Sequence, residues 1–235
     1  MKYWVLVTFI AVIFFLILPN IDLSLSKYIY DLQGGFLPKD SGIMGIIYYS
    51  TYVIVGLTAI IGGILYLYQF FSGRSFKILN KQFIIFFILV LFMSPGLMVN
   101  GIFKANSGRP RPVDVTDFGG KLPYIVPFHI TNHCPHNCSF VSGHASTGFT
   151  LMAIGFVLQD KRMQFYIIGI LAGLISGIFR IMQGGHFLSD IIFAGIVTYI
   201  TSYLVYCLIY SKYYGIIVKI ENKVKMIIMP SEKNS

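Results

Sequence analysis

Residues 180–190 bring three kinds of chemistry into a short and otherwise apolar stretch. Arg180 supplies a fixed positive charge, His186 an imidazole and Asp190 a carboxylate. Charged side chains at or within a membrane are costly, and this cost marks them as candidates for function. If the chain is helical from Phe187 onward, His186 and Asp190 share one helix face. Asp190 would then fix one ring nitrogen of His186 and leave the other free to act as a nucleophile.

A simpler interpretation of this stretch needs no chemistry. It would be a helical hairpin whose polar loop holds a histidine and an aspartate by chance. Gly184 and Gly185 suit either interpretation, because they end a helix and allow Arg180 to turn back toward His186. The stretch alone leaves both interpretations open.

Two other polar segments carry matching chemistry. Lys104 and Arg111 lie seven residues apart after one apolar stretch, and Ser142-Gly143-His144 begins another. Arginine, lysine and the free N–H groups at a helix start all bind phosphate. The same donors stabilise the charge that develops during phosphoryl transfer. If the helix ends are neighbours in a bundle, these segments form one phosphate site with His186.

The three segments, in this order, resemble the motifs of the type 2 phosphatidic acid phosphatase superfamily of membrane lipid phosphatases. The family motifs are Lys-x6-Arg-Pro, Pro-Ser-Gly-His and Ser-Arg-x5-His-x3-Asp. Their counterparts here are Lys104 to Arg111-Pro112, Val141-Ser142-Gly143-His144, and Phe179-Arg180 to His186 and Asp190. Val141 replaces the family proline, and Phe179 replaces the family serine. The second change removes one possible hydrogen bond to phosphate.

The resemblance implies a role for each retained residue. His186 would attack phosphorus and form a phosphohistidine, with Asp190 orienting the ring. His144 would protonate the leaving oxygen and later activate water. The resemblance implies no metal and no other cofactor. The groups implied to hold the phosphate are Lys104, Arg111, Ser142, the Gly143 N–H and Arg180.

The composition is that of an integral membrane protein. Of 235 residues, 56% are hydrophobic and 11% are charged, and the mean hydropathy is +0.74, whereas a soluble domain has about 25% charged residues. The net charge of +9 is better explained by membrane topology than by nucleic-acid binding. We expect the bilayer and a lipid substrate as partners, with no nucleic acid and no obligate protein partner.

The apolar stretches predict one all-α domain over residues 1–235, with six transmembrane helices in a bundle. A signal peptide is the alternative for the first stretch, but no small-x-small cleavage site follows it. The expected spans are residues 3–19, 43–71, 83–103 (kinked at Pro95-Gly96), 142–159, 163–180 and 187–210. We expect residues 83–210 to form the motif-bearing core and residues 211–235 a cytoplasmic tail.

A short interfacial helix is expected after the first span. Its apolar positions share one face, and its charged residues lie elsewhere. The apolar positions are Ile21, Leu25, Tyr28 and Ile29, and the charged ones are Asp22, Lys27 and Asp31.

The distribution of basic residues predicts the orientation. The N-terminus, the 72–82 loop, the 160–162 turn and the tail hold 11 of the 18 Lys and Arg residues. The positive-inside rule therefore places both termini in the cytoplasm. All five histidines, between residues 129 and 186, then lie at the outer face, which is the periplasmic face of a bacterial inner membrane.

Cysteine and histidine residues crowd the loop before Ser142. Zinc is one interpretation, but the spacing matches none of the usual ligand pairs. In an oxidising periplasm a Cys134–Cys138 disulfide is the preferred one, and it would brace the loop. The residues concerned are His129, His133, Cys134, His136 and Cys138.

The segments 137–146 and 184–187 resemble the branch of the family that dephosphorylates lipid A in Gram-negative bacteria. This resemblance implies a lipid A phosphatase, with the 4′-phosphate preferred over the 1-phosphate. Undecaprenyl pyrophosphate and phosphatidylglycerophosphate remain alternative substrates, since pocket shape decides between them. A transporter is a distant alternative, because the charges gather at one face and no internal repeat is present.

Overall fold

The computed structural model describes residues 2–40 and 42–210, together with residues 215, 219, 220, 223, 224 and 226. Within these residues the regular structure is helical, and the only β-type pairing is a single bridge between Val115 and Leu122. The predicted all-α class is therefore confirmed. Most of the tail predicted over residues 211–235 lies outside the described residues.

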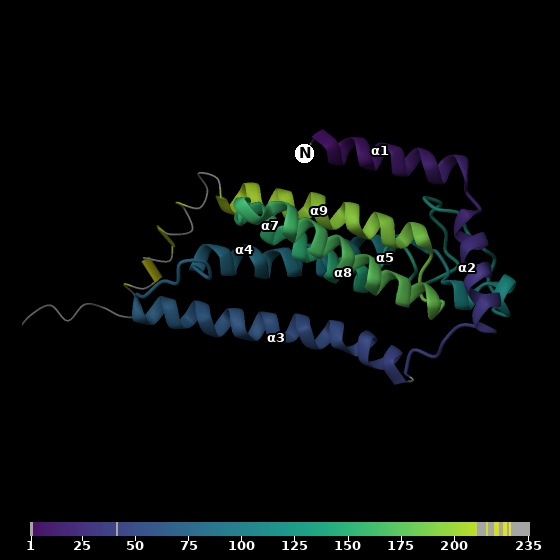
Figure 1. Ribbon diagram of the computed structural model, residues 1–235, viewed down its shortest axis with the longest axis horizontal. Coiled ribbons are helices and arrows are strands. Elements are labelled where there is room, and N and C mark those ends of the chain that lie inside the picture. The colour runs from purple at the N-terminus through teal and green to yellow at the C-terminus, as the bar shows by residue number, and fades with distance from the viewer. Residues whose placement is uncertain are drawn as a thin grey trace, which may run out of the picture.

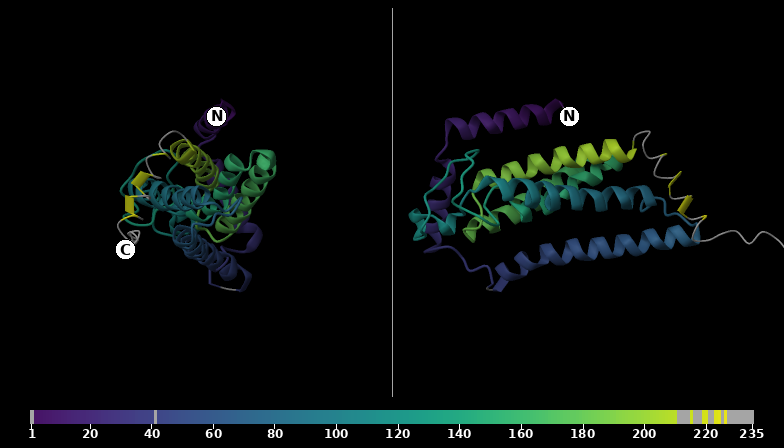
Figure 2. Two further views of the ribbon diagram at one scale, coloured as in Figure 1. Left: turned by 90° about the vertical axis from the view of Figure 1, so that its left-hand side faces the viewer. Right: turned by 180° about the vertical axis from the view of Figure 1, so that it is seen from behind.

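A central group of helices carries all three motifs, and two other helices flank it (Figure 1). The first flanking helix, α1 (Lys2–Ile17), lies beside α9, and the second, α3 (Gly42–Ser72), lies beside α4 on the opposite side (Figure 2). The central helices are α4 (Lys81–Leu91), α5 (Lys104–Ser107), α6 (Gly143–Phe149), α7 (Ile154–Val157), α8 (Arg162–Met182) and α9 (Leu188–Tyr210).

Helix α2 (Ile21–Gln33) crosses one end of the bundle at 77° to α1. The loop that contains residues 108–142, the α8–α9 turn and the start of α9 lie at this same end (Figure 1). The α3–α4 loop and the C-terminal end of α9 lie at the other end. All three motifs therefore meet at the end that α2 covers.

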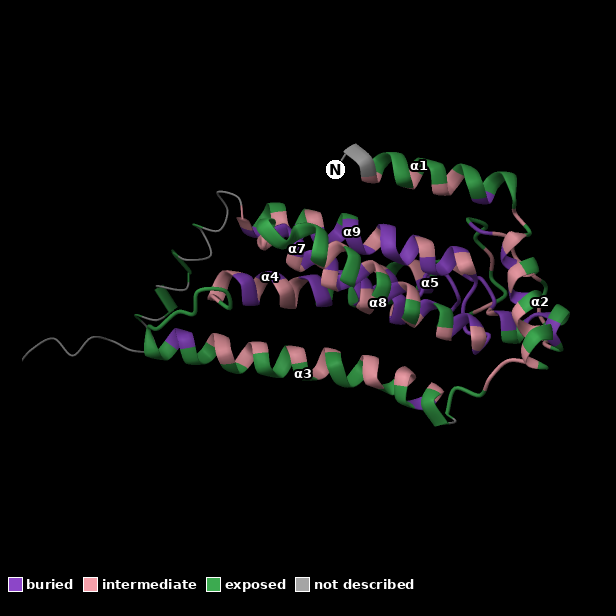
Figure 3. Ribbon diagram, viewed as in Figure 1, coloured by how far each residue is buried: buried purple, intermediate pink, exposed green. Residues whose placement is uncertain are grey.

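Four of the helical segments are long and apolar enough to cross a membrane. They are Gly42–Ser72, Lys81–Asp114, Gln159–Met182 and Leu188–Tyr210. The bent pair formed by α1 and α2 raises the number to five if it counts as one span. Large apolar side chains on α1 and α3 are exposed at the outside of the bundle (Figure 3), as expected of surfaces that face lipid.

The fourth predicted span is less regular than its hydropathy suggests. Helix α6 passes into a 3₁₀ turn (Thr150–Ala153), and α7 ends the helical run at Val157. The helical run from α6 through α7 covers only residues 143–157, which is too short to count among the spans above. The structure therefore supports the helical bundle of the prediction, but not the number six.

The third predicted span also differs in detail. A π-helical stretch (Phe92–Phe103) replaces the kink expected at Pro95-Gly96 and joins α4 to α5. Pro95 lacks an N–H group, and wider π-type turns accommodate such a break. The Pro95 carbonyl accepts a hydrogen bond from the Asn100 side chain at 2.6 Å.

Small and hydroxylated residues hold the central helices together. Gly169, Gly173 and Gly177 form one face of α8, where a Cβ atom would lie 2.4–2.5 Å from atoms of neighbouring segments. Close backbone approach at small residues is the usual way in which membrane helices pack. The Ser94 hydroxyl donates to Thr198 Oγ1 at 3.1 Å and lies 3.3 Å from the Ser146 hydroxyl, which ties three segments in the core.

Helix α2 does not present the face that its sequence predicts. Ile21, Leu25 and Ile29 pack against the core as expected, but Tyr28 is 65% exposed and Asp22 is completely buried. The prediction that Asp22 lies away from the packed face is therefore wrong. The reason is that Asp22 has a buried cationic partner, Arg109, which periodicity cannot reveal.

Candidate active site

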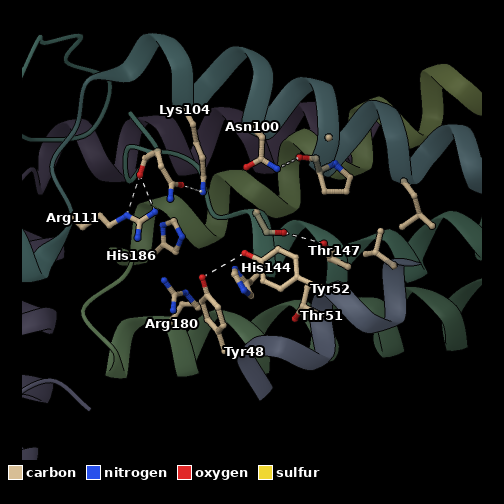
Figure 4. A pocket seen from close by; sticks show the side chains of 16 residues that line it. Tyr48, Thr51, Tyr52, Asn100, Lys104, Arg111, His144, Thr147, Arg180 and His186 are labelled. Carbon is tan, nitrogen blue, oxygen red and sulfur yellow. Dashed lines mark hydrogen bonds between the residues drawn. The ribbon is translucent and has the colours of Figure 1, made fainter. Parts of the chain in front are cut away.

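The three motifs converge on one cavity of about 240 Å³ at the end of the bundle that α2 covers. Figure 4 shows their side chains facing this cavity from several elements. The predicted site residues that line it are Lys104, Arg111, Gly143, His144, Arg180 and His186. The neighbouring polar lining residues are Tyr48, Thr51, Tyr52, Asn100, Asn137 and Thr147.

The cations at the cavity are partnered only by neutral oxygens. Lys104 Nζ donates to Asn137 Oδ1 at 3.2 Å. Arg111 donates through Nε and Nη2 to the Asn137 carbonyl oxygen at 3.1 and 2.8 Å. Arg180 Nη1 donates to Gln183 Oε1. Among the described residues, no carboxylate lies within ion-pair distance of these three cations. Their positive charge is therefore available to an anion in the cavity.

The glycine pair after α8 determines where Arg180 lies. Gly184 has a φ of 63°, a left-handed conformation that favours glycine. A Cβ atom on Gly185 would lie 2.1 Å from Arg180 Nη2. The guanidinium group occupies this space and stacks over the Tyr48 ring, with its carbon 4.9 Å from the ring centroid. The glycines thus bring Arg180 back toward His186, as the sequence predicts.

His186 and Asp190 are close but not joined by a hydrogen bond. Helix α9 begins at Leu188, so His186 precedes it rather than sharing its face. His186 Nδ1 lies 3.4 Å from Asp190 Oδ2 and has no hydrogen-bond partner among the described residues. Burial, and then the positive charges of Lys104 and other nearby cations, hold the pKa of His186 well below its usual range. The ring is therefore neutral, the form in which imidazole acts as a nucleophile.

His144 lies on α6, across the cavity from Arg111 (Figure 4). Its ring packs against Tyr48 and Tyr52 of α3, with centroid distances of 4.6 and 5.2 Å. His144 Nε2 is buried and has no hydrogen-bond partner within the described residues. The nitrogen without a hydrogen bond is thus Nε2 in His144 and Nδ1, which faces Asp190, in His186.

Ser142 and Gly143 occupy different positions relative to the cavity. Ser142 is fully buried, its hydroxyl accepts from the Ala145 N–H at 3.4 Å and caps α6, and it does not line the cavity. Gly143 does line the cavity, and a Cβ atom there would lie 3.3 Å from Asn100 Oδ1 and 3.9 Å from Lys104 Nζ. Of the two, the structure brings only Gly143 to the cations.

Sequence reasoning missed the residues that hold Asp190. Arg109 Nη1 donates to Asp190 Oδ1 at 2.8 Å, and the Ser139 hydroxyl donates to Oδ2 at 2.5 Å. Arg109 Nη2 bonds Asp22 at 2.8 Å. Arg109 is only 1% exposed and does not line the cavity. Only its place inside the first motif could have pointed to it.

The cysteine-rich loop contacts the site through the residue between its cysteines. Cys134 and Cys138 form a disulfide, and Asn137 between them is the acceptor for both Lys104 and Arg111. No three His, Cys, Asp or Glu side chains gather as metal ligands anywhere in residues 2–40 and 42–210. The zinc interpretation of this loop therefore has no support in the structure.

The sequence of this chain is similar to those of known proteins. Residues 82–214 match the model of the PAP2 superfamily. Lipid A 4′-phosphatase of Francisella tularensis subsp. novicida is 39% identical over 210 residues, which cover 88% of this chain and 94% of the relative. Lipid A 4′-phosphatase of Rhizobium etli is 28% identical over 188 residues, covering 74% and 73% of the two chains. No solved structure gives a significant match. The chain belongs to the PAP2 superfamily.

Proposed function

We propose that this protein is a lipid phosphatase that removes a phosphate monoester from a membrane lipid, with the 4′-phosphate of lipid A as the substrate. The observation that carries the proposal is the cavity in which three cations, each partnered only by a neutral oxygen, surround two imidazoles. Family membership supports the phosphatase chemistry, and the relatives named lipid A 4′-phosphatase support the substrate.

The reaction would proceed in two transfers. A ring nitrogen of His186 attacks phosphorus, and the bond between phosphorus and the lipid oxygen breaks while His144 donates a proton to that oxygen. Water then attacks the phosphohistidine, His144 accepts the proton of the water, and inorganic phosphate leaves. The phosphate is held by Lys104, Arg111 and Arg180 and by the Gly143 N–H. Ser142 contributes by capping the helix that carries His144.

We place the protein in a bacterial inner membrane as a single domain with six spans. In this arrangement α6, the 3₁₀ turn and α7 form the fourth span, α1 the first, and α2 lies in the interface. Both termini are cytoplasmic, and the cavity opens at the periplasmic face. The gathering of the cavity, the disulfide and α2 at one end of the bundle supports this orientation.

The test compares lipid A from Gram-negative cells that lack a 4′-phosphatase, with and without this chain, by mass spectrometry. We expect loss of one phosphate when the wild-type chain is present, and fragment ions should place the loss at the 4′ position. His186→Ala should insert into the membrane normally and leave lipid A unchanged. The matched control is His133→Ala, at an exposed position, which should behave as the wild type.

Two results would contradict the proposal at different levels. Dephosphorylation by His186→Ala would overturn the mechanism. An unchanged lipid A profile with the wild-type chain would overturn the substrate, and the purified protein would then be assayed on undecaprenyl pyrophosphate and phosphatidylglycerophosphate. A transporter that uses these charges as a pathway is disfavoured because the charged groups of the cavity gather at one end of the bundle.

A further inference from the structure

A buried network of charges lies directly behind His186, outside the cavity. Its centre is the Arg109 guanidinium, which is 1% exposed and donates to Asp22 and Asp190 at 2.8 Å each. The same side chain donates to the Ser189 hydroxyl at 2.8 Å and to the Ile125 carbonyl oxygen at 2.9 Å. One guanidinium thus connects α2, the loop that contains residue 125, and α9.

Asp22 contacts the start of α9 as well as Arg109. Its Oδ1 accepts from the Ser189 N–H at 2.8 Å, and its Oδ2 accepts from the Ser189 hydroxyl at 2.5 Å. Asp190 accepts from the Phe187 N–H at 2.8 Å. The first N–H groups of a helix have no partner within it. Here Asp22 of α2 accepts from one of them, the Ser189 N–H, and so completes the first turn of α9.

This network fixes the backbone that directly follows the reacting ring. His186 lies one residue before Phe187, and its Nδ1 is 3.4 Å from Asp190 Oδ2. Phe187 packs on the guanidinium group, with the Arg109 carbon 4.4 Å from its ring centroid. A shift of α9 or of Asp190 would therefore move the imidazole relative to phosphate.

We propose that Asp22 and Arg109 are positioning residues, which together hold Asp190 and the first turn of α9 so that His186 faces the phosphate site. The inference rests on the proposed phosphatase function. Arg109 pairs with Asp22 as well as with Asp190, so its guanidinium is divided between the two carboxylates. Arg109 thus bridges two carboxylates, and Asp190 keeps an oxygen 3.4 Å from the imidazole, where it stabilises the positive charge that the ring gains on reaction.

The network also makes α2 part of the enzyme. Because Asp22 is the α2 side chain bonded to Arg109 and Ser189, displacement of α2 would release the start of α9. Asp31 provides a matched control, since it lies on the same helix and is exposed. Asp22→Asn and Asp31→Asn make the same change of charge on the same helix.

The experiment measures kcat and KM of the purified full chain in detergent, using short-chain phosphatidic acid as a water-soluble phosphomonoester probe. We expect Asp22→Asn to lower kcat by at least about tenfold with KM within about twofold, because misplacing a reacting group by an ångström can cost about 100-fold. Asp22→Glu should recover part of the loss. Asp31→Asn should match the wild type.

A pH profile separates positioning from a loss of folded protein. The charged or titratable groups around His186 are Lys104, Arg111, Arg180, His144 and Asp190, with Arg109 and Asp22 behind them. Replacing the Asp22 carboxylate leaves Arg109 with Asp190 as its only carboxylate partner, which makes protonation of the ring less favourable. The acidic limb of kcat/KM should therefore move to lower pH in Asp22→Asn, whereas a smaller folded fraction would leave its position unchanged.

A second pair of variants keeps the test valid if Asp22→Asn folds poorly. Ser189→Ala removes the hydroxyl between Asp22 and Arg109 without changing any charge, and it should lower kcat less than Asp22→Asn. Arg109→Gln should lower kcat strongly, and adding Asp22→Asn to it should cost little more, since both residues act through the same group.

The outcomes distinguish the two proposals. If the wild type and Asp31→Asn cleave the phosphomonoester and His186→Ala does not, the function stands. If Asp22→Asn then matches Asp31→Asn in kcat and in the acidic limb, the positioning role is wrong while the function survives. If the wild type cleaves neither this probe nor the 4′-phosphate of lipid A, the proposed function fails first.

Discussion

Asp190 is held by more groups than its spacing from His186 indicates. The sequence predicts a helix-face pair, but Asp190 is the third residue of α9 and accepts hydrogen bonds from Phe187, Ser139 and Arg109. These bonds orient the carboxylate, and the carboxylate then approaches His186 at 3.4 Å. A carboxylate held by three donors keeps its place, so the imidazole next to it has a fixed neighbour.

The buried, neutral His186 predicts how stability depends on pH. Its pKa is lowered in the folded chain, whereas in the unfolded chain the imidazole titrates near its usual value, about 6.5. As pH falls below that value, the unfolded state binds a proton that the folded state does not, and stability is lost. One such proton costs up to about 1.4 kcal/mol per pH unit.

We therefore expect the thermal unfolding midpoint of the detergent-solubilised chain to fall between pH 7 and pH 5. His186→Gln should reduce the fall, and His133→Gln, at an exposed position, should leave it unchanged. An equally steep fall in His186→Gln would show that another group is responsible.

Helices α6 and α8 pack closely against each other at Gly148. Gly148 on α6 lies against the backbone of α8, where a Cβ atom would meet the Ala172 carbonyl carbon and oxygen at 2.7 Å. Backbone atoms cannot rotate away as a side chain can. Since α6 also carries His144, this contact sets the distance between His144 and Arg180 at the end of α8.

We predict that Gly148→Ala lowers both stability and activity. Overpacking of this kind costs about 1–3 kcal/mol, and moving α6 displaces His144. Gly63→Ala is the control, because a Cβ atom there has no neighbour within 4 Å. The unfolding midpoint and kcat of Gly63→Ala should equal or exceed those of the wild type. Wild-type values for Gly148→Ala would mean that α6 and α8 separate easily.

At the scale of the whole molecule, the two ends of the bundle have different characters. The cavity, the disulfide and the buried Asp22–Arg109–Asp190 group lie toward one end. The loop between α3 and α4, with three basic residues between positions 74 and 81, lies at the other. In the proposed orientation this basic loop lies on the cytoplasmic side, as the positive-inside rule favours.

The orientation predicts the result of reporter fusions. A fluorescent protein that folds only in the cytoplasm should be bright when fused after residue 235, and dark when fused after Gly119 in the loop near the cavity. Alkaline phosphatase, which is active only in the periplasm, should give the reverse pattern. A bright fusion at Gly119 with a dark one at the C-terminus would reverse the proposed topology.

Much of the site was predictable, because its residues lie at fixed spacings within helix ends that a bundle brings together. Lys104, Arg111, His144, Arg180 and His186 all line the cavity that their spacing predicts. The supporting residues were not predictable, because their partners are distant in the chain. Asp22 and Arg109 are 87 residues apart. Hydrophobic periodicity shows which positions are polar, but not which residues they contact. The same limit concealed Asn137, which binds Lys104 and Arg111 from the disulfide loop.

The neutral partners of the three cations have a consequence for turnover. Asn137 and Gln183 can be exchanged for an incoming dianion without breaking any ion pair. The free phosphate released at the end of each cycle presents the same oxygens to the same cations. We therefore expect product inhibition, with inorganic phosphate competing for the site against the lipid from which it was cleaved.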